Sequence, residues 1–388
     1  MIIEKTKDWQ RINELFAIAF SLPKTTGPGK PEADHLTYWA ACDDSCHMMS
    51  ALTLTDYTVN FDGHPCRMSG VGGVSTLPQY RGRGGIRGIF EACLPDLYNQ
   101  GYDFSYLYPF SSAFYRKFGY ENCVQKLNMK LDLGRIRPSS ATGSCLLCEP
   151  GSPMAWEITQ LDQLWEQRFN MAVQHGDGPR DWAVKPDPAS TLQSTYVYFD
   201  GAHRPKAYVT FSTQEQPDGR NLQCSRLVFT DADSFAGIIR LFAGFAYDHR
   251  YVKFQLPAGE GMEYLLQEWA SGAAHWDVDT AGMVRVINVM SVLRKARYQG
   301  TGSLRLGITD PQIPENTGCY EIRYEIGKAL SVEKSQEPAE VSMPISSFSA
   351  LITGAGNPAW MPDVEVHSPN ISLSDIFYHK PLMITDFF

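Results

Sequence analysis

A strand–helix–strand pattern occurs twice in this chain, and this duplication restricts the fold more than any other feature of the sequence. In each copy, apolar residues at helical spacing lie between two β-rich runs, and the second run leads into a proline. The predicted elements are residues 67–76, 86–97 and 104–108 in the first copy, and residues 222–229, 234–249 and 251–256 in the second. A repeated unit of this kind predicts an α/β fold with two related domains.

The residues before and within the first copy predict a helix and a hairpin. Apolar residues follow one helical face over residues 9–20, ahead of Pro23, which a helix does not readily pass. The β-rich residues 47–61 and 67–76 flank Asp62-Gly63, a dipeptide typical of tight hairpin turns. We therefore expect the first domain to begin with a helix and to contain this hairpin.

The sequence pattern changes near Met283 and predicts a third, α+β domain. Helices are expected near residues 289–297 and 345–352, alternating strands near 304–308 and 320–326, and a loop over 333–339. A chain of 388 residues is longer than a single hydrophobic core normally serves. We expect three domains, at residues 1–145, 146–283 and 284–388.

Composition and charge exclude several classes of protein. Hydrophobic residues make up 43% of the chain and charged residues 20%, as in globular rather than disordered proteins. The net charge of −9 disfavours nonspecific binding to nucleic acid and is compatible with cationic substrates. The sequence has neither the apolar core of a signal peptide at its start nor a run of about 18 apolar residues. We therefore expect a cytoplasmic protein with no membrane segment.

Nine cysteines are scattered along the chain, an odd number that favours reduced thiols over a disulfide framework. Two groups could supply metal ligands, namely Cys42, Cys46 and His47 in one, and Cys145 and Cys148 in the other. A structural zinc site usually pairs two such groups at a short, defined spacing, whereas these two lie far apart. We expect no metal site.

The strongest chemical signal lies between the strand and the helix of the first copy, where residues 81–87 read Arg-Gly-Arg-Gly-Gly-Ile-Arg. Glycines let the backbone approach a ligand closely, the start of a helix attracts anions, and the arginines add positive charge. The segment lacks the Lys-Ser/Thr ending of a nucleotide-triphosphate loop and the glycine spacing of dinucleotide-binding folds. It predicts a pyrophosphate site, and an exposed basic loop is the alternative on this pattern alone.

The corresponding turn of the second copy has a different character. Residues 230–233 read Thr-Asp-Ala-Asp, without glycine or arginine. Carboxylates at a helix start repel an anion instead of binding it. We expect the second copy to be a structural duplicate without an anion site.

Three features together resemble the Eis-type (enhanced intracellular survival) N-acetyltransferases of the GNAT superfamily. They are the turn at residues 81–87, the motif Tyr-Arg-Lys-Phe-Gly-Tyr at residues 115–120, and a degenerate second unit before an α+β tail. The resemblance spans the whole chain. It implies an α/β (α+β) protein with tandem GNAT-like units, the first active and the second degenerate, followed by a sterol-carrier-like C-terminal domain.

The resemblance also implies acetyl-CoA as the co-substrate and assigns residues to it. The strand before the turn would offer backbone groups to the pantetheine, and the turn would hold the pyrophosphate. The residues are Val74 and Thr76 on the strand, and Arg81, Gly82, Arg83, Gly84, Gly85 and Ile86 in the turn. Ile86 departs from the small residue usual in the superfamily, a departure that Eis-like proteins tolerate.

Two residues are assigned to catalysis by the same resemblance. Tyr115 aligns with the tyrosine that protonates the departing thiolate, and a tyrosine packed at a helix start is the alternative. Phe388 aligns with the aromatic residue whose terminal carboxylate serves as the base for the incoming amine. Anchoring of the third domain by its apolar end is the alternative for Phe388.

The predicted function is transfer of an acetyl group from acetyl-CoA to primary amines of a cationic small molecule, with aminoglycosides implied by the resemblance. Two alternatives stay open: acetylation of polypeptide lysine, and non-catalytic carriage of an apolar ligand by the C-terminal domain. Because Eis-like proteins are typically hexameric, a homo-oligomer is implied. No nucleic-acid or membrane partner is expected.

Overall fold

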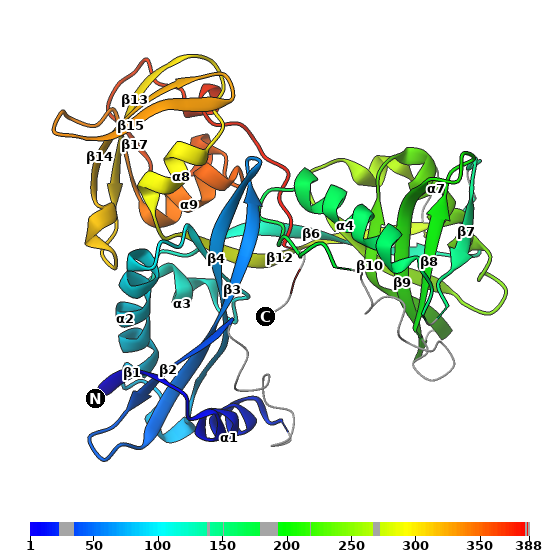
Figure 1. The fold of residues 1–388 in the computed structure, drawn as a ribbon, viewed down its shortest axis with the longest axis horizontal. Coiled ribbons are helices and arrows are strands. Elements are labelled where there is room, and N and C mark those ends of the chain that lie inside the picture. The colour runs from blue at the N-terminus through cyan, green and yellow to red at the C-terminus, as the bar shows by residue number, and fades with distance from the viewer. Residues whose placement is uncertain are drawn as a thin grey trace. The chain divides into compact units, whose positions relative to one another are not determined.

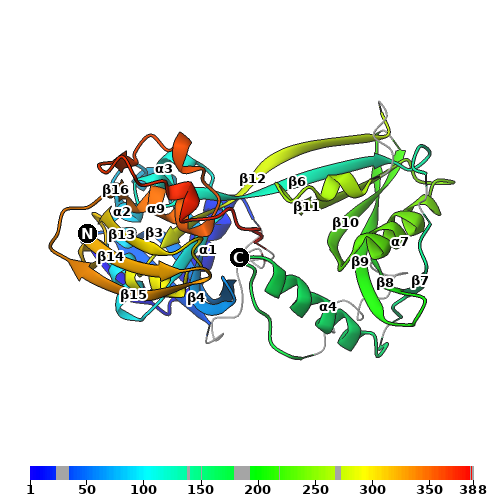
Figure 2. The same ribbon diagram turned by 90° about the horizontal axis from the view of Figure 1, so that it is seen from above.

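The computed structural model describes residues 1–22, 35–137, 140–149, 151–178, 193–217, 219–266, 272–384 and 386. The chain forms two compact units (Figure 1; Figure 2). The first unit contains Met1–Val124, Asn170–Val173 and Ala281–Phe388, and the second contains Gln125–Phe169 and Gln174–Thr280. The first copy of the repeat and the C-terminal domain therefore belong to one unit, and the second copy belongs to the other.

The main sheet of the first unit holds the first copy of the repeat, with the strand order β1-β2-β3-β4-β5-β12. The strands are β1 (Ile2–Thr6), β2 (Leu36–Cys42), β3 (Met48–Phe61), β4 (His64–Thr76), β5 (Phe104–Leu107) and the end of β12 (Ala274–Val286), and the helices are α1 (Trp9–Phe20), α2 (Gly85–Asn99) and α3 (Ser112–Arg116). β4 and β5 run parallel and are joined by α2, which buries Phe90, Cys93 and Leu94 in the core. The predicted strand–helix–strand unit is confirmed.

The predicted first helix and hairpin are confirmed as well. α1 ends at Phe20, and β3 and β4 pair in antiparallel register with Phe61 opposite His64. The two turn residues, Asp62 and Gly63, have φ values of 52° and 88°. A two-residue turn with both φ values positive matches the right-handed twist of the strands, which explains the Asp-Gly sequence.

The sheet of the second unit holds the second copy, with the strand order β6-β11-β10-β9-β8-β7. Its elements are β6 (Glu121–Asp132), β7 (Ser144–Leu147), α4 (Ala155–Arg168), β8 (Gln193–Phe199), β9 (Pro205–Gln216), β10 (Gly219–Phe229), α7 (Ala232–Ala243), β11 (Tyr251–Pro257) and the 3-10 helix η3 (Met262–Leu265). β10 and β11 run parallel, with Asn221 beside Tyr251, and α7 joins them. The predicted duplication is therefore confirmed. The helix is shorter than expected because Gly244, a weak helix former, takes the C-cap position after Ala243.

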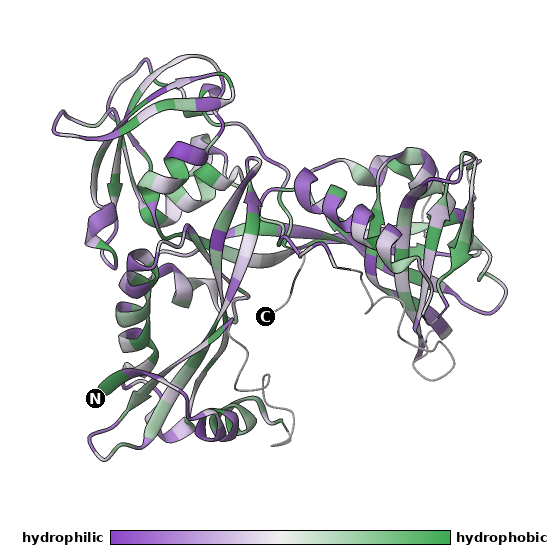
Figure 3. Ribbon diagram, viewed as in Figure 1, coloured by the Kyte–Doolittle hydropathy of each residue, from purple (hydrophilic) through white to green (hydrophobic). Residues whose placement is uncertain are grey.

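The C-terminal domain is α+β, as predicted, with a five-stranded sheet of order β15-β14-β13-β16-β17. Its elements are α8 (Val289–Lys295), β13 (Gly302–Thr309), η4 (Pro314–Asn316), β14 (Gly318–Glu325), β15 (Lys328–Ser335), β16 (Val341–Pro344), α9 (Ile345–Thr353), η5 (Pro358–Trp360), β17 (Glu365–Val366) and η6 (Leu373–Asp375). Figure 3 shows hydrophobic residues along the strands and on parts of α8 and α9. Leu306, Ile322 and Phe348 are fully buried in the resulting core.

The predicted loop over residues 333–339 is wrong at its start, because β15 extends to Ser335. β15 is an edge strand, in which Val332 is buried whereas Lys328 and Glu333 are exposed. Edge strands commonly carry charged side chains that prevent pairing with other chains. These charges made the strand resemble a loop in the sequence.

A buried network joins the C-terminal domain to the sheet of the first copy. Arg285 on β12 and Asp310 after β13 have fully buried side chains and form two charged hydrogen bonds, of 2.7 and 3.2 Å. In the same loop, Ile313 packs into the aromatic core beneath α3, and the Gln312 side-chain amide donates to the Lys117 carbonyl at 2.9 Å. The C-terminal domain thereby fixes the end of α3.

A second buried ion pair fixes the C-terminal segment. The Lys380 Nζ lies 2.5 Å from the Asp62 Oδ2, and both side chains are fully buried. Breaking such a pair would leave an uncompensated buried charge, so the segment is held firmly to the β3–β4 turn.

All nine cysteines are free thiols. Within the part of the chain that the structure describes, no three His, Cys, Asp or Glu side chains gather as metal ligands would. No helix among the described residues is both long and apolar enough to span a bilayer.

Candidate active site

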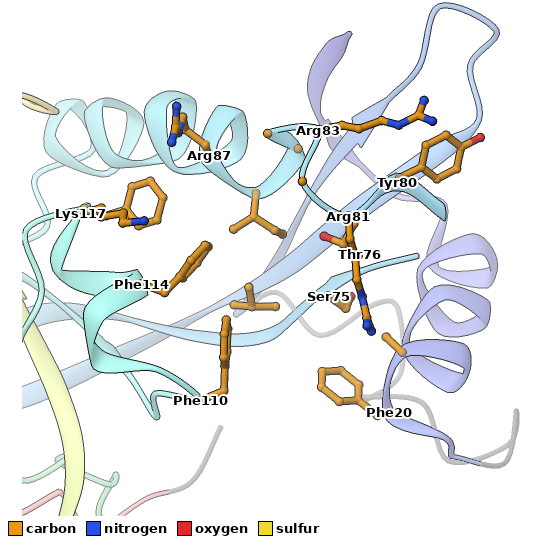
Figure 4. Close-up of a pocket in the computed structure, with 17 residues that line it drawn as sticks. Phe20, Ser75, Thr76, Tyr80, Arg81, Arg83, Arg87, Phe110, Phe114 and Lys117 are labelled. Carbon is orange, nitrogen blue, oxygen red and sulfur yellow. The ribbon is translucent and has the colours of Figure 1, made fainter. Parts of the chain in front are cut away.

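A cavity of about 740 Å³ opens in the first unit beside the end of β4, the start of α2 and α3 (Figure 4). Its lining includes every residue that the sequence assigned to acetyl-CoA, namely Val74, Thr76, Arg81, Gly82, Arg83, Gly84, Gly85 and Ile86. The two parts of that assignment, the strand and the turn, thus face the same space.

The turn between β4 and α2 depends on its glycines. Gly82 and Gly84 have φ values of 79° and 83°, which residues with a Cβ rarely adopt. Gly85 has a different role, because a Cβ there would lie 2.4 Å from the Ser50 Oγ on β3. Gly85 therefore lets α2 begin close to the sheet.

The start of α2 is open to an anion. Gly84 is the N-cap and provides no side-chain hydrogen bond, and no acidic residue lies in the first turn. The first backbone N–H groups of a helix lack partners within it and carry partial positive charge. In α7, the corresponding helix of the second copy, the Asp231 carboxylate accepts a hydrogen bond from the Ser234 N–H at 2.9 Å. A carboxylate thus occupies the start of α7, whereas the corresponding place at the start of α2 is open to an anion.

Four cationic side chains line the cavity: Arg81, Arg83, Arg87 and Lys117. None of them forms an ion pair with a described residue, and no described aspartate or glutamate belongs to the lining. Arg83 lies over the ring of Tyr80, 5.3 Å from its centroid. Four uncompensated positive charges around one cavity favour a polyanionic ligand.

The strand β4 presents a free edge along the cavity. β4 pairs with β5 only as far as Val71 and Leu107, but it continues beside β3 to Thr76. A β-bulge interrupts the β3–β4 register in this stretch, where Gly73 has a φ of 59°, and bulges bend the strand that contains them. Val74 and Thr76 lie beyond the last β5 pair, where a ligand can bind the backbone as a strand would.

Tyr115 lies on α3, next to the cavity but outside its lining. Its ring is 2% exposed and packs edge-on against Phe90, Phe110 and Phe114, at centroid distances of 6.2, 5.2 and 5.2 Å. Burial raises the pKa of the Tyr115 hydroxyl, which therefore stays protonated at neutral pH. The hydroxyl has no hydrogen-bond partner among the described residues. A protonated hydroxyl without a partner is available as a proton donor.

Tyr120, in the same motif, differs from Tyr115 because its hydroxyl is hydrogen-bonded. Its side chain is fully buried, and its hydroxyl bonds to the Ser105 Oγ at 2.7 Å. Ser105 in turn donates to the Ser69 carbonyl at 2.9 Å. The Tyr120 hydroxyl is therefore committed to a buried chain of hydrogen bonds between β4 and β5.

Phe388 lies outside the described residues. The described tail ends at Asp386, whose backbone carbonyl accepts a hydrogen bond from the Tyr108 hydroxyl at 2.5 Å. Burial and the Asp386 charge raise the pKa values of both Tyr57 and Tyr108. Tyr108 begins the loop that carries Phe110, which lines the cavity, so the tail is held to that loop.

Arg87 also lines the cavity and belongs to the predicted turn at residues 81–87. No role was assigned from the sequence to the rest of the lining, which is mainly aromatic: Ala19, Phe20, Ser75, Tyr80, Phe110, Phe114, Lys117 and Phe118. Phe114, Lys117 and Phe118 lie within one helical turn of Tyr115, and this proximity was the available signal. Phe20 comes from α1, and nothing in its local sequence relates it to the turn at residues 81–87.

Three parts of the chain match known protein families. Residues 4–123 match an acetyltransferase (GNAT) domain, residues 162–286 match a second acetyltransferase (GNAT) domain, and residues 289–365 match a sterol carrier protein domain. No curated protein sequence matches the chain.

Several solved structures share the fold of the entire chain. It is similar to a GCN5-related N-acetyltransferase from Anabaena variabilis, with a TM-score of 0.85, 18% identity and 100% of both chains covered. A probable N-acyltransferase from Enterococcus faecalis gives a TM-score of 0.83 and 19% identity over 100% of this chain and 99% of that chain. Eis1 from Mycobacterium abscessus gives a TM-score of 0.79 and 15% identity, with 100% of both chains covered.

Proposed function

Because this chain is a GNAT acetyltransferase with two GNAT domains and a sterol carrier protein domain, we propose that it acetylates primary amines of cationic small molecules, with acetyl-CoA as the donor. Aminoglycosides are the proposed acceptor class. The observation that carries the proposal is the cavity in the first domain, with an open helix start, four cations that pair with no described residue, and a protonated tyrosine beside it.

In this proposal the pyrophosphate of acetyl-CoA binds at the start of α2. The backbone N–H groups after Gly84 donate to its oxygens, and Arg81 and Arg83 add charge-assisted contacts. Gly82 provides the backbone conformation that the turn needs. Gly85 and Ile86 form the first positions of the helix and line the same space.

The pantetheine follows the free edge of β4. Its amide groups bond to the backbone near Val74 and Thr76, in the place that a neighbouring strand would take. In this placement the thioester lies toward α3, the helix that carries Tyr115.

The chemistry requires two proton transfers. The neutral amine attacks the thioester carbonyl, a C–N bond forms, the C–S bond breaks, and the thiolate takes the proton of the Tyr115 hydroxyl. The amine loses its proton to the base, which we propose to be the terminal carboxylate of Phe388. An α-carboxylate has a pKa of about 3.3 to 3.7 and is therefore ionised at neutral pH.

The charges of the site favour separate places for the donor and the acceptor. The cavity is lined with cations and suits the anionic donor, whereas a cationic amine needs negative charge near it. The carboxylates of Asp386 and Phe388 would supply that charge on the tail, which the Tyr108 hydroxyl holds.

The carrier alternative has less support, because the apolar residues of the C-terminal domain belong to a core that it shares with the first copy. Leu306, Ile308 and Phe348 are at most 2% exposed and belong to one core cluster that also includes Phe104 and Val286 of the first copy.

The binding part of the proposal predicts one acetyl-CoA per chain. Calorimetric titration should give one site, because α7 has an aspartate cap where α2 has an open start. The variant Arg81→Ala should bind acetyl-CoA about 1.5 to 3 kcal/mol more weakly, since a charge-assisted contact is lost.

The matched control is Arg323→Ala, which removes an arginine paired with Glu321 on β14. It should bind acetyl-CoA as the parent does. Two equivalent sites per chain, or unchanged affinity in Arg81→Ala, would contradict the proposed site.

A further inference from the structure

The four cations of the cavity fall into two groups. Figure 4 shows Arg81 and Arg83 on one side, at the glycine turn, and Arg87 and Lys117 on the other side. The pyrophosphate proposed for the turn is matched by the first group together with the start of α2. Neither cation of the second group has a counterion among the described residues, and the proposed pyrophosphate contacts involve only Arg81 and Arg83 of the four.

Lys117, at the end of α3, is a cation that can bind a ligand. Its neighbour Arg116 is already paired with Glu121, through Nε–Oε2 at 2.8 Å and Nη2–Oε1 at 2.5 Å. Lys117 is exposed, lines the cavity, and has its backbone carbonyl fixed by the Gln312 side chain at 2.9 Å. The structure thus directs one unpaired charge, on a fixed backbone, into the cavity.

We propose, building on acetyl-CoA as the donor, that Lys117 and Arg87 bind the 3′-phosphate of the ADP portion of CoA. This phosphate is a monoester with a charge of about −1.5 to −2 at neutral pH, and two cations match it. The other two cations, Arg81 and Arg83, match the charge of the pyrophosphate at the turn. The enzyme therefore selects CoA against 3′-dephospho-CoA, which carries the same pantetheine and diphosphate.

The arrangement assigns different tasks to the two groups. Arg81 and Arg83 contact a feature common to CoA and its dephospho form, so they contribute to affinity for both. Lys117 contacts a group that only CoA carries. Replacing Lys117 must therefore weaken the binding of CoA but not that of the dephospho form. A general change in cavity charge would weaken both.

The test measures the dissociation constants of CoA and 3′-dephospho-CoA with the full chain and its variants. The parent should bind CoA about tenfold more tightly than 3′-dephospho-CoA. Lys117→Ala should lose most of this preference and leave the affinity for 3′-dephospho-CoA within about twofold of the parent. Lys117→Arg should keep the preference, because it retains the charge. Lys117 is exposed, so these variants are expected to fold.

Lys328→Ala is the control for loss of one positive charge, since Lys328 pairs with Glu325 away from the cavity and is exposed. It should keep the parent's preference. Equal affinity of the parent for both ligands would overturn the proposal, and so would Lys117→Ala weakening both ligands equally. Failure of the parent to bind either ligand would instead overturn acetyl-CoA as the donor, and the two failures are thus distinguishable.

Discussion

Replacing Tyr115 with phenylalanine is expected to lower turnover by about 10²- to 10⁴-fold, the usual effect of losing a general acid. The ring stays packed against Phe90, Phe110 and Phe114, and only the hydroxyl is removed. Affinity for acetyl-CoA should change little, because only the hydroxyl is lost and it acts as the thiolate leaves. Steady-state kinetics together with a binding titration separate the two effects.

The matched control is Tyr120→Phe, the same change in the same motif. Its hydroxyl bonds to Ser105, so the variant should lose about 1 kcal/mol of stability and keep most of its turnover. If Tyr115→Phe keeps turnover to within about twofold of the parent, the hydroxyl is not the acid and Tyr115 is a packing residue.

Displacing the terminal carboxylate is the second change with a large expected effect. Deleting Phe388, or extending the chain beyond it by a few polar residues, should lower turnover by about 10²-fold or more, because the proposed base is lost or moved. The extension is the sharper variant, since it keeps the aromatic ring in the sequence. The measurement is turnover at saturating acetyl-CoA, with affinity for acetyl-CoA as the internal check.

If Phe388 only anchored the C-terminal domain by packing, the extension would not lower turnover. The Asp62–Lys380 ion pair and the hydrogen bond from Tyr108 hold the described part of the tail, so the extended protein should fold with an unchanged melting temperature. If it folds and acetylates at the parental rate, the carboxylate is not the base.

The parts of the site that the sequence predicted are those encoded in short contiguous segments. The turn at residues 81–87 combines glycines with positive φ, arginines and a helix start, and each is visible locally. The same is true of the Asp62-Gly63 hairpin. For these features the chemistry of neighbouring residues determines the conformation.

The parts that the sequence did not predict depend on contacts between distant segments. Phe20 reaches the cavity from α1, and Gln312 fixes the end of α3 from the C-terminal domain. The segment Asn170–Val173 belongs to the first unit although the flanking residues belong to the second, because the Met171 N–H donates to the Asn60 carbonyl on β3. No local pattern marks such contacts, and α3 is too short to show a helical period.

The most direct test of the central claim is release of free CoA thiol from acetyl-CoA across a panel of amines. The panel contains an aminoglycoside, a lysine-containing peptide and a neutral amine, and the products are analysed for acetylated amine. We expect thiol release to require an amine, to be fastest with the aminoglycoside, and to give one acetylated amine per thiol released. Thiol release at the same rate without any amine, or no release with any member of the panel, would contradict the central claim.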